Sequence, residues 1–186
     1  YYAYWYQITI PQVNSMVCLN FNGDDNGVVF TDLSGKVWTA AGTAITDTAQ
    51  KAFGTASMLL DGNSDYISTP AHKDFNLGAG DFTIEFWGMF DNFTPNPSFM
   101  IPLSCYKDAN NYFLCQIYTT QTAGLLYVEV QNKIDSVLNI NYASGSLGAI
   151  SADTFYHFAI VRKNGSIQCF LDGVAKVLDT SGCDGE

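Results

Sequence analysis

Positive charge is scarce in this sequence. Its 186 residues include 8 Lys and Arg against 18 Asp and Glu, a formal net charge of −10, and Arg162 is the single arginine. Proteins that bind nucleic acids present a stripe of basic side chains to the phosphates, so this composition excludes nucleic acid as a partner. An acidic balance of this size favours solubility and is compatible with a bound cation.

Long apolar runs are also missing. No stretch approaches the roughly 18 apolar residues of a membrane-spanning helix, and the N-terminus lacks the basic, apolar and small-residue order of a signal peptide, so we expect no membrane insertion. Hydrophobic residues still make up 47% of the chain and aromatic residues 15%, enough for one folded domain with a sizeable core. Because the chain starts at Tyr1 rather than Met and stops at Glu186, we expect a piece of a longer polypeptide.

The cysteines are odd in number and include no CxxC pair, so the sequence predicts neither a zinc site nor a disulfide framework. They are Cys18, Cys105, Cys115, Cys169 and Cys183. Buried free thiols on strands are the expectation. A pairing of Tyr106 with Tyr112 across the turn between them places the sulfur atoms of Cys105 and Cys115 diagonally, without a bond.

The strongest structural signal lies near the C-terminus. Three β-type runs at 155–163, 166–171 and 174–178 are joined by Asn164-Gly165 and Asp172-Gly173. These dipeptides suit the positive φ angles of type I′ hairpin turns, so the pattern predicts a three-stranded antiparallel meander.

The register that these turns set places apolar residues on both faces of the meander. Lys163 then pairs with Ser166, and Leu171 with Val174. One face carries Phe158, Ile160, Cys169 and Leu171, and the other carries Ala159, Val161, Phe170, Ala175 and Val177. A sheet that is apolar on both sides is usually covered on both, by a second sheet and by loops or a neighbouring chain.

Short strands and turns also recur upstream. The strand-like runs are 56–60, 66–69, 82–86, 99–106, 112–118 and 125–131. Helical spacing occurs at 44–53, where Ile45, Ala49, Ala52 and Phe53 lie on one stripe. This segment is too short for more than about two turns of helix. The predicted fold is all-β, a two-sheet antiparallel sandwich.

Seven short segments follow one another between Leu19 and Lys176. They are LNFNG at 19–23, FTDLSGKVWTA at 30–40, FGTAS at 53–57 leading to Asp61-Gly62, DYISTP at 65–70, GDFTIEFW at 80–87, YHFAIVR at 156–162 and FLDG at 170–173. In order and composition they resemble the laminin-G-like, concanavalin A-like jelly rolls, especially those found in tailed-phage structural proteins. The resemblance spans most of the chain.

The resemblance implies a laminin-G-like sandwich over residues 18–186, preceded by an aromatic lead-in at 1–17. It also implies further strands after the Asp172-Gly173 hairpin. Because the chain stops soon afterwards, we expect the sandwich to lack its closing C-terminal strands.

Several relatives of this fold hydrolyse glycans, a reaction that needs two carboxylates facing the sugar. The glucanase pattern Glu-x-Asp-x-x-Glu is absent. Glu85 and Asp91 are the nearest candidates, but Gly88 interrupts the strand between them. His157 is expected to be a hydrogen-bonded sheet residue, His72 a loop residue, and no GxSxG run supplies a serine nucleophile. We expect no catalytic residues and no required cofactor.

Calcium is the cofactor that the acidic loops allow, because Ca²⁺ prefers clustered carboxylate and carbonyl oxygens. The candidate ligands are Asp24 and Asp25 in one loop and Asp61 and Asp65 in another. Laminin-G-like domains often carry a calcium at the rim of the sandwich, although the turn chemistry of Asx-Gly runs explains the same residues without a metal.

Aromatic side chains are the remaining candidates for binding. Trp38, Tyr66 and Trp87 could stack on sugar rings, and core packing is the alternative for each. The lead-in begins with Tyr1, Tyr2, Tyr4, Trp5 and Tyr6. Such a segment either adds a strand to the domain or contacts a neighbouring chain, and we favour the contact.

Two functions follow from these observations. The first is a non-catalytic structural or adhesion domain of a virion, such as a phage capsid-decoration or tail protein, or of another extracellular assembly, with neighbouring chains as partners. The alternative is a secreted carbohydrate-binding module that recognises a cell-surface glycan, with or without a bound calcium ion. Both place the protein in a virion or outside the cell.

Overall fold

A computed structural model describes residues 15–77, 80–93, 99–108, 111–119, 125–133 and 141–183. The chain divides into two compact units. The first consists of Tyr1–Asn76 and Phe86–Met89, and the second of Leu77–Glu85 and Phe90–Glu186. Within the described ranges, no helix is long and apolar enough to cross a membrane.

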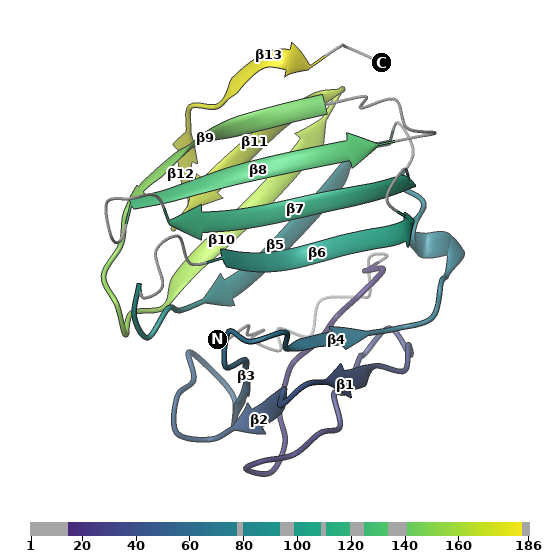
Figure 1. The fold of residues 1–186 in the computed structure, drawn as a ribbon, viewed down its shortest axis with the longest axis vertical. Coiled ribbons are helices and arrows are strands. Elements are labelled where there is room, and N and C mark those ends of the chain that lie inside the picture. The colour runs from purple at the N-terminus through teal and green to yellow at the C-terminus, as the bar shows by residue number, and fades with distance from the viewer. Residues whose placement is uncertain are drawn as a thin grey trace. The chain divides into compact units, whose positions relative to one another are not determined.

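Short strands and turns build the first unit (Figure 1). Its elements are β1 (Thr39–Ala41), β2 (Ile45–Asp47), β3 (Ser57–Leu59), β4 (Tyr66–Ser68) and the 3-10 helix η1 (Lys73–Phe75). Strand β1 pairs antiparallel with β4, and β2 with β3. Phe21 and Phe30 are buried, and their rings meet edge to face with centroids 6.0 Å apart. This contact forms an aromatic core beneath the short strands.

The helical spacing at residues 44–53 does not give a helix. Ile45–Asp47 forms β2 instead. The amide of Thr46 donates to the carbonyl oxygen of Gly27 at 2.7 Å, and its hydroxyl donates to the carbonyl oxygen of Asp24 at 2.6 Å. These long-range hydrogen bonds, together with pairing to β3, override the weak helical preference of a segment of about two turns.

A five-stranded antiparallel sheet forms one layer of the second unit. In spatial order its strands are β13 (Asp179–Cys183), β9 (Asn141–Ala149), β8 (Leu125–Lys133), β7 (Asn111–Thr119) and β6 (Phe99–Asp108). The predicted pairing of Tyr106 with Tyr112 is confirmed, and it places Cys105 and Cys115 diagonally across the hairpin. Both of these cysteines are free thiols.

The other layer is a four-stranded sheet that contains the predicted meander. Its order is β12 (Val174–Lys176), β11 (Ser166–Leu171), β10 (Tyr156–Lys163) and β5 (Phe82–Gly88). The predicted register is confirmed, with Lys163 opposite Ser166 and Leu171 opposite Val174. All four turn residues have positive φ angles, as type I′ turns require. They are Asn164, Gly165, Asp172 and Gly173.

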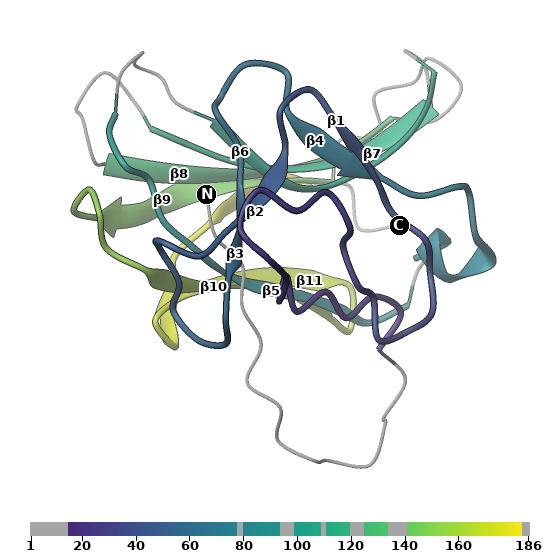
Figure 2. The ribbon, with the colours of Figure 1, turned by 90° about the horizontal axis from the view of Figure 1, so that it is seen from below.

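The two sheets form separate layers of the second unit, as Figure 2 shows. Buried side chains occur on both: Cys115, Ile117 and Val128 from the five-stranded sheet, and Phe158, Ile160, Cys169 and Leu171 from the meander. The all-β, two-sheet antiparallel sandwich predicted from the sequence is therefore confirmed. The opposite face of the meander is apolar but less covered, since Val177 is 92% exposed while Ala159 is buried.

The sequence pattern did not predict β9 or β13. Strand β13 follows the last hairpin and pairs antiparallel with β9 at the edge of the five-stranded sheet. The expected lack of closing C-terminal strands stays a prediction. Gly145 in β9 permits this arrangement. A Cβ at this position would lie 2.6 Å from the carbonyl oxygen of Val177 and 3.1 Å from the Cα of Leu178, on the segment that leads to β13.

Candidate functional site

The exposed side of the five-stranded sheet carries a row of tyrosines on β6 and β7. Cys115 and Ile117 are buried, so strand alternation turns their neighbours on β7 to the opposite, outward side. Tyr112 and Tyr118 belong to this outward set, and Tyr106 lies opposite Tyr112 on β6. We call Tyr106, Tyr112 and Tyr118 the tyrosine face.

Two members of the tyrosine face form a stacked pair. The rings of Tyr106 and Tyr112 have centroids 6.3 Å apart and an interplanar angle of 22°. Tyr106 is 67% exposed, and Tyr112 and Tyr118 are half-buried. Two nearly parallel rings on neighbouring strands make an aromatic surface whose solvent-exposed member is Tyr106, and such a surface suits the apolar face of a ligand ring.

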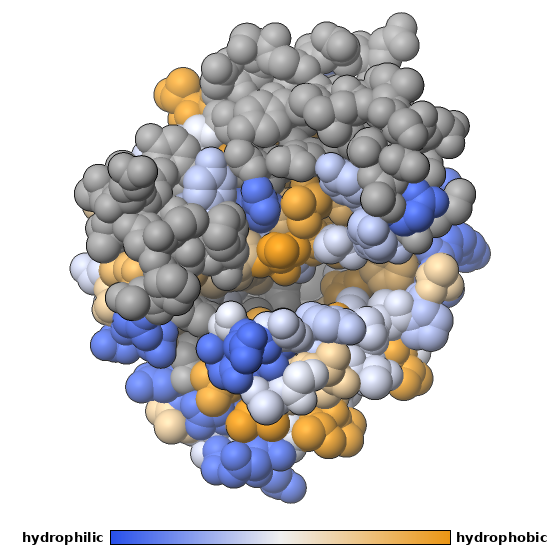
Figure 3. Space-filling model, viewed as in Figure 1, coloured by the Kyte–Doolittle hydropathy of each residue, from blue (hydrophilic) through white to orange (hydrophobic). Residues whose placement is uncertain are grey.

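Apolar and polar groups lie beside the stacked pair. Leu114 and Gln116 take the outward positions between Tyr112 and Tyr118, and both are half-buried. Ile101 on β6 is 53% exposed. Figure 3 shows hydrophobic surface in the middle of this side of the sheet, over β6 and β7, with polar surface next to it. An apolar surface with a few polar groups is typical of a ligand-binding site.

Sequence reasoning missed the tyrosine face, although it paired Tyr106 with Tyr112. The signal was the alternation along 112–118. Tyr112 and Tyr118 stand at even-numbered positions, and the small or aliphatic Cys115 and Ile117 stand at odd-numbered positions, which face the other side of a strand. That alternation could have identified the site.

The predicted sugar-binding residue Trp38 is tied to a buried carboxylate. Its indole Nε1 donates to Oδ2 of Asp32 at 2.9 Å, and the amides of Cys18 and Ser34 donate to Oδ1 at 3.0 and 2.7 Å. Burial by itself raises the pKa of Asp32, but these hydrogen bonds outweigh it and hold the pKa below its ordinary value. Trp38 thus anchors the loops of the first unit.

The other two predicted sugar-binding residues occupy different settings in the first unit. Trp87 meets Phe53 edge to face with ring centroids 5.2 Å apart, and it is half-buried. Tyr66 begins β4 and is 57% exposed. Of the three, Tyr66 has the exposure that a stacking surface needs, and sugar binding by any of them stays a prediction.

The structure brings Asp61 and Asp65 together around Thr43. The Thr43 hydroxyl donates to Asp61 Oδ2 at 3.0 Å, and its amide donates to Asp65 Oδ1 at 2.6 Å. The amide of Asp61 donates to Asp65 Oδ2 at 2.8 Å. Burial raises the pKa of Asp65, but the hydrogen bonds from Asp61 and Thr43 outweigh it, so the pKa lies below its ordinary value.

Asp24 and Asp25 lie in a separate loop with partners of their own. Oδ1 of Asp25 accepts from the Thr48 amide at 3.1 Å, whereas Asp24 accepts through its main-chain oxygen. Within the part of the chain that the structure describes, no group of three His, Cys, Asp or Glu side chains is placed to hold a metal. The oxygens of Asp61 and Asp65 already accept hydrogen bonds from Thr43 and from the Asp61 amide, and calcium binding at these loops stays a prediction.

A hollow of about 320 Å³ opens in the first unit around Lys36 and His72. Lys36 Nζ forms an ion pair with Asp74 Oδ2 at 2.9 Å, donates to Ser34 Oγ at 3.2 Å and to the main-chain oxygen of Met16, and lies over the ring of Phe75. His72 accepts from the Asp74 amide at 3.3 Å and caps η1. The hydrogen-bond donors of Lys36 are therefore committed to the fold.

The residues considered for hydrolysis are also accounted for by the fold. Glu85 Oε2 lies 3.5 Å from Nε2 of His157, and the main chain of His157 is bound to Asp172 by hydrogen bonds of 2.8 Å in both directions. Asp91 lies beyond the end of β5 and is exposed. The side chains of Glu85 and His157 therefore approach each other across the neighbouring strands β5 and β10 of the four-stranded sheet.

The predicted interface residues Tyr1, Tyr2, Tyr4, Trp5 and Tyr6 lie outside the described residues. The same holds for most of the predicted lead-in at 1–17, so the domain boundary and the interface both stay predictions.

Comparison with known proteins gives one match. The family model described as the concanavalin A-like lectin/glucanases superfamily matches residues 61–180, which is more than half of the chain. This region contains the whole tyrosine face and most of both sheets. No curated protein and no solved structure shows a significant match to the chain.

Proposed function

Because the chain belongs to the concanavalin A-like lectin/glucanases superfamily, we propose that it is a non-catalytic adhesion domain that binds carbohydrate through its tyrosine face. It acts on the surface of a virion, such as a phage capsid-decoration or tail protein, or in another extracellular assembly. A carbohydrate-binding or structural role fits the superfamily, and the adhesion role and location are the parts that we propose.

One observation carries this proposal: the ring of exposed Tyr106 is stacked on the ring of half-buried Tyr112. Pyranose rings present C–H groups on one side, and these pack against aromatic faces while the hydroxyl groups remain in water or bind polar side chains. Gln116, two positions beyond Leu114 on the same side of β7, is a polar and half-buried residue within this face.

The absence of catalysis is supported by the carboxylate distribution. A glycoside hydrolase needs two carboxyl groups on either side of the scissile bond, one as acid and one as nucleophile or base. Glu129 of β8 lies opposite Gln116 of β7 in the register, and the sequences of these two strands contain no other acidic residue. A single carboxylate cannot fill both roles.

A structural role in a virion or similar assembly is the second candidate, and exposed aliphatic side chains of the first unit favour it. Val28, Val29, Leu33 and Val37 are between 51% and 76% exposed, within ten residues of sequence. Apolar surface of this kind commonly marks contacts with other chains.

Glycan-array binding of the full chain tests the proposed function. We expect the wild type to bind a subset of neutral glycans, and Tyr106→Ala to lose that binding. Tyr66→Ala is the matched control, because it removes an exposed tyrosine of the first unit. Loss of binding in the control instead, or release of reducing ends from a bound glycan, contradicts the proposal.

A further inference from the structure

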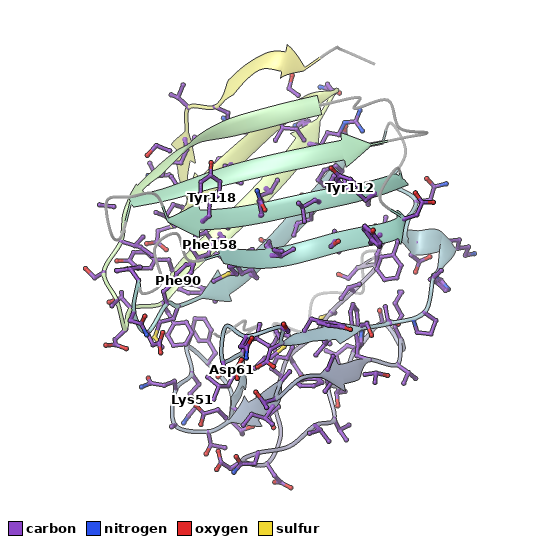
Figure 4. All side chains as sticks on the ribbon, viewed as in Figure 1. Lys51, Asp61, Phe90, Tyr112, Tyr118 and Phe158 are labelled. Carbon is purple, nitrogen blue, oxygen red and sulfur yellow. The ribbon has the colours of Figure 1, made fainter. Side chains whose placement is uncertain are left out.

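The tyrosine face is elongated along a single strand. Tyr112 and Tyr118 both belong to β7 and are six residues apart. At about 3.3 Å per residue their Cα atoms are about 20 Å apart. Figure 4 shows the two side chains on the same side of the sheet, near opposite ends of the strand. The stacked pair of Tyr106 and Tyr112 marks one end of this row, and Tyr118 marks the other.

The surface between the two ends is continuous. Leu114 and Gln116 fill the outward positions between them, and both are half-buried. Their cross-strand neighbours on β8 are Gln131 and Glu129. A ligand that reached from Tyr112 to Tyr118 would therefore cross an apolar position and then a polar position.

The charge of the chain limits what can bind there. The formal net charge is −10, and Glu129 takes a register position in the middle of the face. A polyanionic ligand would meet repulsion along its whole length.

We propose that the ligand of the tyrosine face is a straight, uncharged polysaccharide segment that lies along β7, with one sugar ring on the Tyr106–Tyr112 pair and a later ring on Tyr118. The inference rests on the proposed carbohydrate binding and adds the shape, minimum length and charge of the glycan.

The shape follows from the geometry of the strand. A disaccharide that sits on Tyr112 ends well short of Tyr118, so binding at both ends needs a longer chain. Chains joined through equatorial β-1,4 linkages are extended and can follow a strand, whereas α-1,4-linked glucans curve away from it. Occupying both ends with one ligand adds a second contact with little further loss of translational freedom, so affinity increases with length.

Calorimetric titration of the full chain tests the inference. The probes are di-, tetra- and hexasaccharides of the straight cello-, manno- and xylo-series, with malto-oligosaccharides as curved equivalents and sulfated cellohexaose as the charged equivalent. We expect at least one straight hexasaccharide to bind about tenfold or more tighter than its disaccharide, a difference of about 1.4 kcal/mol or more. The curved and charged probes are expected to bind more weakly.

Two variants assign the length effect to the two ends of the face. Tyr118→Ala should abolish the gain from di- to hexasaccharide, while Tyr112→Ala should weaken the binding of both the disaccharide and the hexasaccharide. Equal binding of short and long sugars, preference for the curved or sulfated probe, or an unchanged length effect in Tyr118→Ala overturns the inference and leaves carbohydrate binding intact. Failure of every probe to bind overturns the inference and the proposed function together.

Discussion

Single polar residues determine how the loops of the first unit are held. Asp32 is 7% exposed and accepts hydrogen bonds from the Cys18 and Ser34 amides and from the Trp38 indole. These hydrogen bonds tie residues 18, 34 and 38 to one buried carboxylate, in addition to the contact of buried Phe21 and Phe30 in the same unit. Its ionised form fits the site, since every partner is a donor.

Replacing Asp32 with Asn is therefore expected to destabilise the fold. The Asn amide nitrogen would face the Trp38 N–H, and leaving that donor unsatisfied costs about 2 kcal/mol near neutral pH. Because the folded-state pKa of Asp32 is lowered, its contribution is present above its unfolded pKa of about 3.9 and is lost as the pH falls through the folded value.

Urea unfolding of wild type and Asp32→Asn between neutral and strongly acidic pH measures this difference. We expect the gap in unfolding free energy to be largest near pH 7 and to shrink below about pH 4. Asp24→Asn is the control, because Asp24 bonds through its main chain. If the difference in unfolding free energy between wild type and Asp32→Asn does not change with pH, the ionised carboxylate of Asp32 is not what stabilises the loops.

Gly42 is a second residue on which the first unit depends. Its φ angle is +67°, and a Cβ there would lie 2.1 Å from Oδ1 of Asp65. Gly62 has a φ angle of +79°, and a Cβ on this residue would have no atom within 4 Å. We expect Gly62→Ala to cost about 1 kcal/mol from backbone strain alone and Gly42→Ala to cost clearly more.

Thermal unfolding of the two variants tests this comparison. Gly42→Ala combined with Asp65→Ala should recover part of the melting temperature relative to Gly42→Ala alone, since the obstructing carboxylate is gone. Equal melting temperatures for Gly42→Ala and Gly62→Ala would rule out the close approach as the cause.

At the scale of elements, local turn chemistry explains what the sequence could predict. Asn164-Gly165 and Asp172-Gly173 need positive φ angles, and that requirement alone determines the register of β10, β11 and β12. The alternation of apolar residues on β7 and β8 likewise predicts which side is buried. Both signals lie within a few residues of the strands that they describe.

The elements that sequence reasoning missed depend on distant partners. Strand β9 reads NYASGSLGA, which has few of the β-branched and aromatic residues typical of strands, and it forms because β8 and β13 pair with it. Thr46 makes β2 a strand through bonds to the loop at 24–27. The tyrosine face combines residues of two strands, so it becomes evident only when the outward positions of β6 and β7 are considered together.

Strand β13 depends on the close approach at Gly145. The amide and carbonyl groups of 177–178 lie too near this position for a side chain. We expect Gly145→Ala to reduce the unfolding free energy by about 1–3 kcal/mol through overpacking. Hydrogen exchange should report the change as lost amide protection in β13 and in the β9 residues that pair with it.

Ala149→Ser provides the control for Gly145→Ala, because Ala149 is exposed on the same strand. Its effect should stay within about 0.5 kcal/mol. Loss of protection throughout the sandwich, rather than at β9 and β13, would mean that Gly145 supports the core instead of the closing strand.

At the scale of the whole molecule, the sandwich of the second unit buries a free thiol in each of its sheets. Cys115 on β7 is 0% exposed, and Cys169 on β11 is 1% exposed. Both are free. Burial raises the pKa of Cys169 to about 12 and also raises the pKa of Cys115. Because the thiolate is the reactive form, neither sulfur is expected to react while the two sheets stay together.

These two cysteines should therefore report on opening of the sandwich as a unit. In native buffer we expect maleimide labelling, followed by peptide mapping, to modify the half-buried Cys18 and Cys105 before the buried Cys115 and Cys169. Added urea should raise the labelling rates of Cys115 and Cys169 in parallel. Both rates should depend on the urea concentration as global unfolding does, because one cooperative transition exposes both inner faces. Faster labelling of one of the two in dilute urea would show that its sheet opens on its own, and the sandwich would then not be a single cooperative unit.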